Sequence, residues 1–318
     1  MTSLIGNAPV DGVDVAALLG IPISAEQERA VQAPLKPCAV IAGAGTGKTT
    51  VMAARVVWLV ASRLVSPEEI LGLTFTNKAT AELSERIESN LTRVGLLTSE
   101  QPRPTVATYD SFAGTLVNDY GAWDGISTGA HLITGARAYQ LAAEVVMGLD
   151  KAPLAATHMG PTFIAQAVVK LAGAMASHDA SPGKVRRADA RWRQMLLAAP
   201  TKRGGDRYAD IDKWLSRVDE REELLDLVAA YQNLKKERGL VEFGDRMVQA
   251  LHLVTHHPRV GEELRARYRV VLLDEYQDTS SAQADVLAAL FSGPDSAHGM
   301  GHPVMAVGDP LQAIYEWR

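Results

Sequence analysis

The sequence is poor in the residues that build disulfide frameworks, metal–thiolate centres and membrane spans. Its 318 residues include a single cysteine, Cys38, which excludes an internal disulfide and any zinc or iron–sulfur centre built on several thiolates. The longest apolar runs, such as residues 56–61, fall far short of the ~20 residues that a membrane span needs. The N-terminus carries Asp11 and Asp14 and no basic segment followed by an apolar one, so a secretory signal is not expected. We therefore expect a cytoplasmic chain with no membrane partner.

Neither sign of charge dominates, and aromatic residues are few. The 32 Lys and Arg against 37 Asp and Glu give a net charge of −5, and aromatic residues make up 6%. These values exclude a strongly basic chain that coats nucleic acid, so any such contact has to come from a local patch. The apolar fraction of 47% is typical of a soluble globular protein. Because a domain typically has roughly 150 residues, the length fits two domains.

Short apolar segments alternate with helical ones at both ends of the chain. Helices alternating with short buried strands predict an α/β fold with a parallel sheet flanked by helices. The five segments with strand character are residues 38–42, 70–75, 105–108, 269–273 and 303–307.

The middle of the chain has helical patterns and loops but almost no strand character, which predicts a mostly helical insertion that splits the α/β domain. The expected division is a flexible leader over residues 1–20, a discontinuous core over 21–119 and 227–318, and an inserted accessory domain over 120–226.

A glycine-rich loop at residues 42–49 lies between an expected strand and an expected helix. Backbone N–H groups of such a loop wrap around phosphates, and the helix N-terminus favours their charge. Lys48 would reach the outer phosphates, and the Thr49 hydroxyl would ligate Mg²⁺. A chance glycine-rich turn is the alternative, which the Gly-Lys-Thr sequence in this context disfavours. The predicted nucleotide-binding residues are Ala44, Gly45, Thr46, Gly47, Lys48, Thr49 and Thr50.

Two carboxylates, Asp274 and Glu275, directly follow the fourth strand segment, at the edge of the sheet where ligands of such folds bind. Asp274 is placed to hold Mg²⁺ through water, and Glu275 to orient or deprotonate the attacking water. An Asp-Glu pair after a strand is by itself as often a helix cap. The catalytic interpretation of this pair therefore depends on the glycine-rich loop elsewhere in the chain. Gln312 could sense the terminal phosphate. Tyr315 and Trp317 could stack on unpaired bases, although an aromatic pair is by itself more often core packing.

Together these segments resemble the N-terminal half of the UvrD/Rep/PcrA group of superfamily 1 DNA helicases, over nearly the whole chain after residue 20. Residues 24–31 resemble the Q motif, whose glutamine, here Gln27, recognises adenine. Residues 274–278 resemble motif II, and residues 308–318 resemble motif III. The resemblance implies a RecA-like P-loop NTPase core with ATP and Mg²⁺ as cofactors. The catalytic residues that it implies are Lys48, Asp274, Glu275 and Gln312.

Further segments resemble the DNA-contacting motifs of that group. Residues 72–79 resemble motif Ia, residues 108–112 resemble the next motif with Asp110 in place of a typical histidine, and residues 241–245 resemble a worn Asp-Phe-Asp-Asp segment. Without the other motifs, residues 74–78 would be only a strand end and a capped helix. The resemblance implies single-stranded DNA and its junctions with duplex as partners. The implied DNA-binding residues are Phe75, Asn77, Thr108, Tyr109, Tyr315 and Trp317.

The resemblance implies an ATP-dependent 3′-to-5′ DNA translocase and helicase acting in DNA repair or recombination. The alanine-rich sequence of residues 48–55 is similar to that of actinobacterial members such as the AdnAB helicase–nuclease. Two features depart from the group: Thr50 replaces an arginine that often stacks near adenine, and the sequence stops at Arg318, directly after motif III. We therefore expect that the second motor domain is missing and that this chain binds nucleotide without being an active helicase alone. The alternative is a non-catalytic nucleotide- or DNA-binding subunit or fragment.

Two clusters lie outside these motifs. Residues 184–207 hold eight Lys and Arg against two Asp, with Trp192 among them. Such a run is usually a solvated helix face, and a DNA contact is the alternative. His252, His256 and His257 have a spacing that suggests a metal. No carboxylate or thiol is arranged with them in the sequence, and Pro258 ends the helix, so we expect helix-end histidines.

Overall fold

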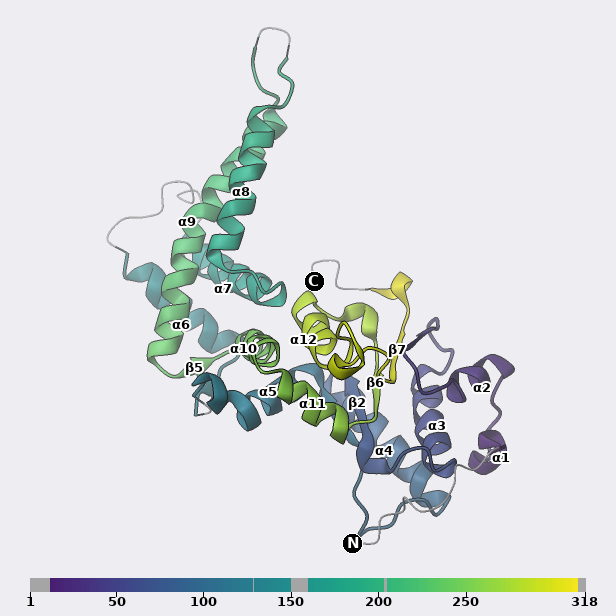
Figure 1. Ribbon diagram of the computed structural model, residues 1–318. Helices are drawn as coiled ribbons and strands as arrows, with labels where there is room; N and C mark the ends of the chain where they lie inside the picture. The colour runs from purple at the N-terminus through teal and green to yellow at the C-terminus, as the bar shows by residue number, and fades with distance from the viewer. Residues whose placement is uncertain (1–11, 128, 150–159, 203–204, 314–318) are drawn as a thin grey trace. The chain divides into compact units, whose positions relative to one another are not determined.

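The computed structural model describes residues 12–127, 129–149, 160–202 and 205–313 (Figure 1). The chain divides into two compact units. The α/β unit comprises Met1–Asp124 and Ala250–Arg318, and the helical unit comprises Gly125–Gln249. Among the described residues, no helix combines the length and the apolar character that a membrane span requires.

A five-stranded parallel sheet forms the centre of the α/β unit. The strand order is β1-β7-β6-β2-β3, and every pairing is parallel. The central strands β6 and β2 are buried along their whole length, as expected of strands covered by helices on both faces. The parallel sheet expected from the sequence is thus confirmed. The strands are β1 (Cys38–Ile41), β2 (Ile70–Thr74), β3 (Thr105–Thr108), β6 (Val270–Leu273) and β7 (Val304–Gly308).

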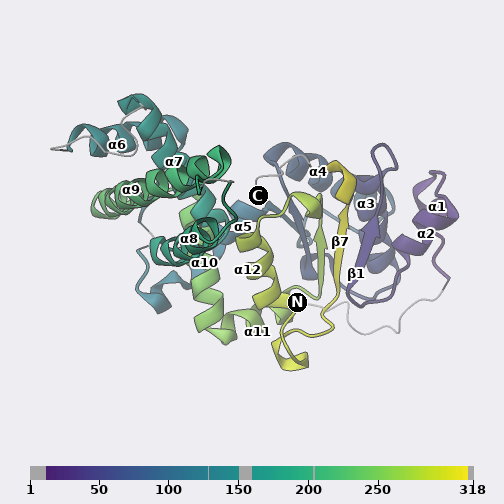
Figure 2. The same cartoon turned by 90° about the horizontal axis from the view of Figure 1, so that it is seen from above.

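Helices cover both faces of this sheet, with α3 and α4 on one face and α11 and α12 on the other (Figure 2). Most of α3 is buried, and Arg55 within it donates to the carbonyl oxygens of Val31 (3.0 Å) and Ala33 (2.8 Å), which ties α2 to α3. The helices of this unit are α1 (Val15–Leu19), α2 (Ala25–Val31), α3 (Lys48–Ala61), α4 (Asn77–Arg93), α5 (Tyr109–Tyr120), α11 (Pro258–Arg267) and α12 (Ser281–Phe291). Its short 3₁₀ turns are η1 (Pro67–Glu69), η2 (Gly121–Asp124), η3 (Tyr276–Asp278), η4 (Ser296–His298) and η5 (Pro310–Gln312).

Residues 12–20 differ from the flexible leader expected from the sequence. The Asp14 carboxylate caps the N-terminus of α1, and Val15 and Leu19 are only 3% and 2% exposed within the core of the α/β unit. Two apolar residues four positions apart bury one face of a single helical turn. Such a short pattern carries little weight in a sequence rich in Gly, Pro and Ala.

The helical unit is built around α9, a helix of 29 residues that packs against the three preceding helices. The expected end of the insertion at residue 226 falls inside α9, and the compact unit instead extends to Gln249. A short parallel pair, β4 (His131–Leu132) with β5 (Leu240–Val241), closes the unit. Its helices are α6 (Gly135–Met147), α7 (Pro161–Ser177), α8 (Pro182–Leu197) and α9 (Ala209–Glu237), and α10 (Phe243–His256) leads back into the α/β unit.

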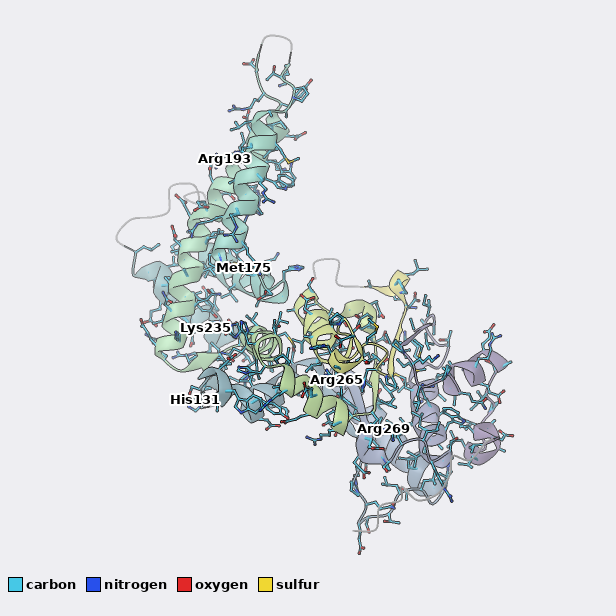
Figure 3. All side chains as sticks on the ribbon, viewed as in Figure 1. His131, Met175, Arg193, Lys235, Arg265 and Arg269 are labelled. Carbon is cyan, nitrogen blue, oxygen red and sulfur yellow. The ribbon has the colours of Figure 1, made fainter. Side chains whose placement is uncertain are left out.

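One lysine of α9, Lys235, is buried in the helical unit (labelled in Figure 3). Its ammonium lies 2.6 Å from the carboxylates of both Glu242 and Asp245, and the Tyr231 hydroxyl donates to Glu242 at 2.8 Å. The Asp245 carboxylate also accepts the backbone N–H of Glu242 at 2.8 Å. Residues 241–245, which resemble a divergent Asp-Phe-Asp-Asp segment, therefore form the junction between α9 and α10. A closed ionic network holds this junction.

Candidate nucleotide site

The glycine-rich loop connects β1 to the N-terminus of α3. Gly45 and Gly47 have φ of 75° and 82°, in the left-handed region that favours glycine. Gly47 caps α3 without any side-chain hydrogen bond, so the first N–H groups of this 14-residue helix have no side-chain acceptor at the cap. A helix N-terminus without a side-chain cap, preceded by a glycine-rich loop, is a common environment for a phosphate.

A pocket of 420 Å³ opens over this loop. Lys48 reaches across it and lies 3.2 Å from the Glu275 carboxylate, which brings together two residues 227 positions apart in the sequence (275 − 48). The predicted loop residues Ala44, Gly45 and Gly47 line the pocket, as do Thr49 and Thr50. The remaining lining residues are Gly43, Lys48, Arg86, Glu275 and Gln312.

Asp274 directly follows β6 and is almost fully buried. Its backbone N–H donates to Leu73 at 2.8 Å, which continues the pairing with β2 and fixes the carboxylate at the edge of the sheet. Burial, followed by the neighbouring Glu275 charge, raises the pKa of Asp274 to about 6 from its ordinary 3.8, and Lys48 opposes this shift. Burial makes this carboxyl group costly to ionise, and a bound metal ion would stabilise its charged form. Asp274 is therefore a suitable metal ligand.

Glu275 lies in a strained backbone conformation, with φ of 46° and ψ of 45°. Its N–H donates to the Asp274 carboxylate at 3.0 Å, and its own carboxylate accepts from the Gln277 amide at 2.8 Å. A residue other than glycine in this region costs about 1–3 kcal/mol and persists where surrounding contacts over-determine it. The structure therefore holds the Glu275 carboxylate in one orientation toward Lys48.

The two predicted glutamines of the site are both already engaged. The Gln312 amide lines the pocket and donates to the Asp309 carboxylate at 2.5 Å. Gln27 caps α2 together with Ser24, and its amide donates to the Thr46 carbonyl of the glycine-rich loop at 2.9 Å. Gln27 thus contacts the loop through the Thr46 backbone, and the Thr46 hydroxyl donates to the Gly43 carbonyl across the loop.

Two residues of the site were not predicted. Gln277 bridges the segments that resemble motifs II and III. Its side-chain oxygen Oε1 accepts the Asp309 N–H at 3.0 Å, while its side-chain Nε2 donates to the Glu275 carboxylate. Gly308 leaves room for this side chain, because a Cβ there would lie 2.3 Å from Gln277 Oε1 and would displace it. Arg86 of α4 donates to the Thr50 hydroxyl at 2.7 Å and lines the pocket. No local pattern in the sequence links Arg86 to the loop, 36 positions away.

The structure separates the predicted DNA-binding residues. Asn77 is exposed at the start of α4, and Phe75 is half-buried beside it. Thr108 is buried as the cap of α5, where its hydroxyl accepts the Ser111 N–H at 3.0 Å. Tyr109 is also buried, with its hydroxyl donating to the Asp274 carbonyl at 3.2 Å and its pKa raised by desolvation. Both side chains are therefore largely covered, and the Tyr109 hydroxyl contacts the backbone at Asp274. Tyr315 and Trp317 lie outside the described residues.

The basic run of residues 184–207 forms much of α8, and several of its charges are paired. Arg186 contacts both Glu222 and Asp226 of α9 at 2.6 Å, and Arg193 pairs with Asp219. The basic side chains of α8 are thus exposed or half-exposed and partly paired with acidic side chains of α9. This agrees with the solvated helix face that the sequence favours. Trp192 is half-exposed and its ring centroid lies 5.9 Å from that of Trp214.

The sequence matches the family model described as UvrD/REP helicase N-terminal domain over residues 23–318. DNA helicase II of Rickettsia typhi is 26% identical over 299 residues, covering 93% of this chain and 38% of the relative. ATP-dependent DNA helicase UvrD1 of Mycobacterium tuberculosis is 28% identical, covering 93% and 34%. DNA helicase II of Haemophilus influenzae is 29% identical, covering 96% and 36%. The chain thus spans little more than a third of the length of these relatives.

Proposed function

Because this chain belongs to the UvrD/REP helicase N-terminal domain family, we propose that its α/β unit binds Mg²⁺–ATP and supplies one half of the ATP-hydrolysis site of a DNA helicase. The observation that carries the proposal is the pairing of Lys48 with Glu275 in one pocket at the uncapped start of α3, with the buried Asp274 carboxylate accepting the Glu275 N–H beside it.

The residues of the pocket fit a nucleotide with its metal ion. The loop glycines and the α3 N–H groups suit phosphate oxygens, and Lys48 supplies a positive charge beside them. The Thr49 hydroxyl and the buried Asp274 carboxylate are the oxygen ligands that would hold Mg²⁺. The bound ion would neutralise charge on the phosphates.

Within this chain, Lys48 and Glu275 exchange partners when nucleotide binds. In the structure the Lys48 ammonium is paired with Glu275 at 3.2 Å. A phosphate that draws Lys48 away leaves the Glu275 carboxylate free to accept a proton from water, while the Gln277 amide keeps it in place. Gln277 also bonds the Asp309 backbone, and Asp309 holds Gln312. This chain of hydrogen bonds connects the water-activating carboxylate to the segment that precedes Tyr315 and Trp317.

We further propose that the whole protein translocates 3′ to 5′ on single-stranded DNA and acts at junctions with duplex, in DNA repair or recombination in the cytoplasm. The printed names of the relatives, DNA helicase II and ATP-dependent DNA helicase, support DNA and ATP as substrates. On this chain, exposed Asn77 and half-exposed Phe75, directly after β2, are the described residues best placed to contact a base.

Titration of the 318-residue chain with a fluorescent ATP analogue and Mg²⁺ tests the nucleotide site. Lys48→Ala removes the charge on the outer phosphates and should weaken binding at least tenfold, about 1.4 kcal/mol. Lys36→Ala, at an exposed lysine outside the pocket, is the matched control and should bind normally. Glu275→Gln should bind at least as tightly as the wild type, because it removes the ion-pair partner of Lys48.

Equal affinity of the wild type and Lys48→Ala would contradict the assignment of the pocket. Hydrolysis measured in the same samples, with and without single-stranded DNA, then separates the two halves of the proposal. DNA-stimulated turnover that depends on Lys48 would show a complete site within this chain, whereas binding without turnover agrees with a half-site.

A further inference from the structure

Three histidines and one aspartate meet in the α/β unit, where the end of α10 lies beside η2. The Asp124 carboxylate lies 2.9 Å from His252 Nδ1 through one oxygen and 2.6 Å from His257 Nε2 through the other. His256 follows His252 by one helical turn, and their rings are stacked with centroids 3.9 Å apart. The carboxylate that the sequence did not associate with these histidines comes from a residue 128 positions before His252.

We propose that Asp124, His252 and His256 form a binding site for a divalent transition-metal ion such as Ni²⁺ or Zn²⁺. One potential ligand atom of each residue lies within 4.8 Å of those of the other two. Two imidazoles and a carboxylate are ligands that suit Zn²⁺, Ni²⁺ and Cu²⁺, and histidines four residues apart on one helix face can share an ion. Small side-chain rotations would bring the three atoms to metal-ligand distances of about 2.0–2.2 Å.

The hydrogen bonds around the cluster orient its ligands. His256 Nδ1 lies 2.8 Å from the His252 carbonyl oxygen, and an N–H that donates there leaves the Nε2 lone pair for a metal. His257 holds one oxygen of Asp124, and the Trp123 ring packs edge-on against His257. An ion would take the place of the hydrogen now shared between Asp124 and His252. The Asp124 side chain is 15% exposed and that of His252 is 59% exposed, so the site is anchored on one side and open to solvent on the other.

The position of the cluster gives the ion a structural role. Asp124 is the last residue before the chain enters the helical unit, and His252 follows soon after the chain returns at Ala250. A metal ion held by η2 and α10 would cross-link these two connecting segments. The site is separate in chemistry from the nucleotide pocket, whose hydroxyl and carboxylate oxygens suit Mg²⁺.

Isothermal titration of the untagged chain with NiCl₂ tests this proposal, in buffer with millimolar Mg²⁺ to occupy the carboxylates of the nucleotide pocket. We expect one high-affinity equivalent of Ni²⁺. His256→Ala and His252→Ala should each weaken it at least tenfold, and because both side chains are exposed, the variants should keep the wild-type circular dichroism spectrum. His298→Ala is the matched control, since His298 also pairs with an aspartate, Asp295, at 2.7 Å, and its removal should leave the affinity unchanged.

A thermal-shift series with Ni²⁺ gives a second readout, in which the wild type should gain stability and the folded His252→Ala/His256→Ala double variant should not. The same Ni²⁺ affinity in the wild type and the double variant would overturn the proposal, as would a wild type that takes up no Ni²⁺ at millimolar concentration. Either result would leave the cluster as helix-end histidines paired with one aspartate.

Discussion

Each unit of the molecule holds a shielded lysine next to carboxylates, and the two lysines differ in how completely they are satisfied. In the helical unit, the Lys235 side chain is 4% exposed and bonds two carboxylates at 2.6 Å. In the α/β unit, Lys48 faces an open pocket, and within the described part of the chain its one ion pair is with Glu275 at 3.2 Å. The first cluster is closed on itself, whereas the second leaves its cation available to an incoming anion.

Two residues close to Lys48 have features that are unfavourable for folding. Asp274 has a raised pKa because it is buried beside a like charge, and Glu275 occupies a left-handed backbone conformation. Neither feature stabilises the fold, and backbone strain and raised carboxyl pKa values are both typical of functional sites. Around Lys235, by contrast, each carboxylate has a hydrogen-bond donor within the unit. A lysine–carboxylate contact alone therefore does not indicate a functional site, whereas an incompletely paired one beside strained neighbours favours one.

The largest expected effect is on the closed cluster. Lys235→Met removes the cation from between Glu242 and Asp245, which are about a quarter exposed, and should destabilise the helical unit by about 3 kcal/mol. Lys48→Met should change the free energy of unfolding by less than about 1 kcal/mol, because its pocket is open to water. Urea unfolding followed by circular dichroism measures both. Adding Glu242→Gln and Asp245→Asn to Lys235→Met should recover part of the loss.

If instead Lys48→Met destabilised the protein as much as Lys235→Met, the two clusters would serve the same purpose. The proposed division between a structural network and a ligand site would then be wrong.

A somewhat smaller effect of opposite sign is expected at Asp274. Its pKa of about 6 in the folded chain lies above the ordinary 3.8, so the folded state holds a proton between these values that the unfolded state has lost. Stability therefore falls as the pH rises through this window, by roughly 2–3 kcal/mol once the pH exceeds 6. Without nucleotide or Mg²⁺, Asp274→Asn should be more stable than the wild type by about that amount at pH 8. The difference should vanish below about pH 4.

Melting temperatures of both proteins from pH 4 to pH 8 measure this crossover. A variant that is less stable than the wild type at pH 8 would mean that the Asp274 charge is better compensated in the folded chain than its burial suggests. Glu275→Gln, tested alongside, separates the contribution of the neighbouring charge from that of burial.

The sequence predicted the elements that are local and missed those made by distant segments. The five strands of the main sheet, the glycine-rich loop and the carboxylate pair follow from short patterns with a defined chemistry. The structure places the loop and Glu275 in the lining of one pocket. The partnership of Asp124 with His252, and of Arg86 with Thr50, depends on chain segments that meet only after folding. The burial of Tyr109 was missed because the sequence around a tyrosine that follows a strand does not show whether its ring faces solvent or the core.

The smallest expected effect concerns Arg86. The resemblance drawn from the sequence implies an arginine near adenine at the position of Thr50. Arg86 of α4 donates to the Thr50 hydroxyl at 2.7 Å, and both residues line the pocket. Arg86 is exposed, so Arg86→Ala should change stability by no more than about 0.5 kcal/mol. If the guanidinium takes the place of the absent arginine, the variant should bind Mg²⁺–ATP about three- to tenfold more weakly. Arg103→Ala, which removes an exposed arginine paired with Glu88 of α4, is the matched control and should bind normally. Unchanged affinity of Arg86→Ala in the same titration would confine Arg86 to holding α4 against the loop, and would leave Lys48 as the pocket's principal cation for the nucleotide.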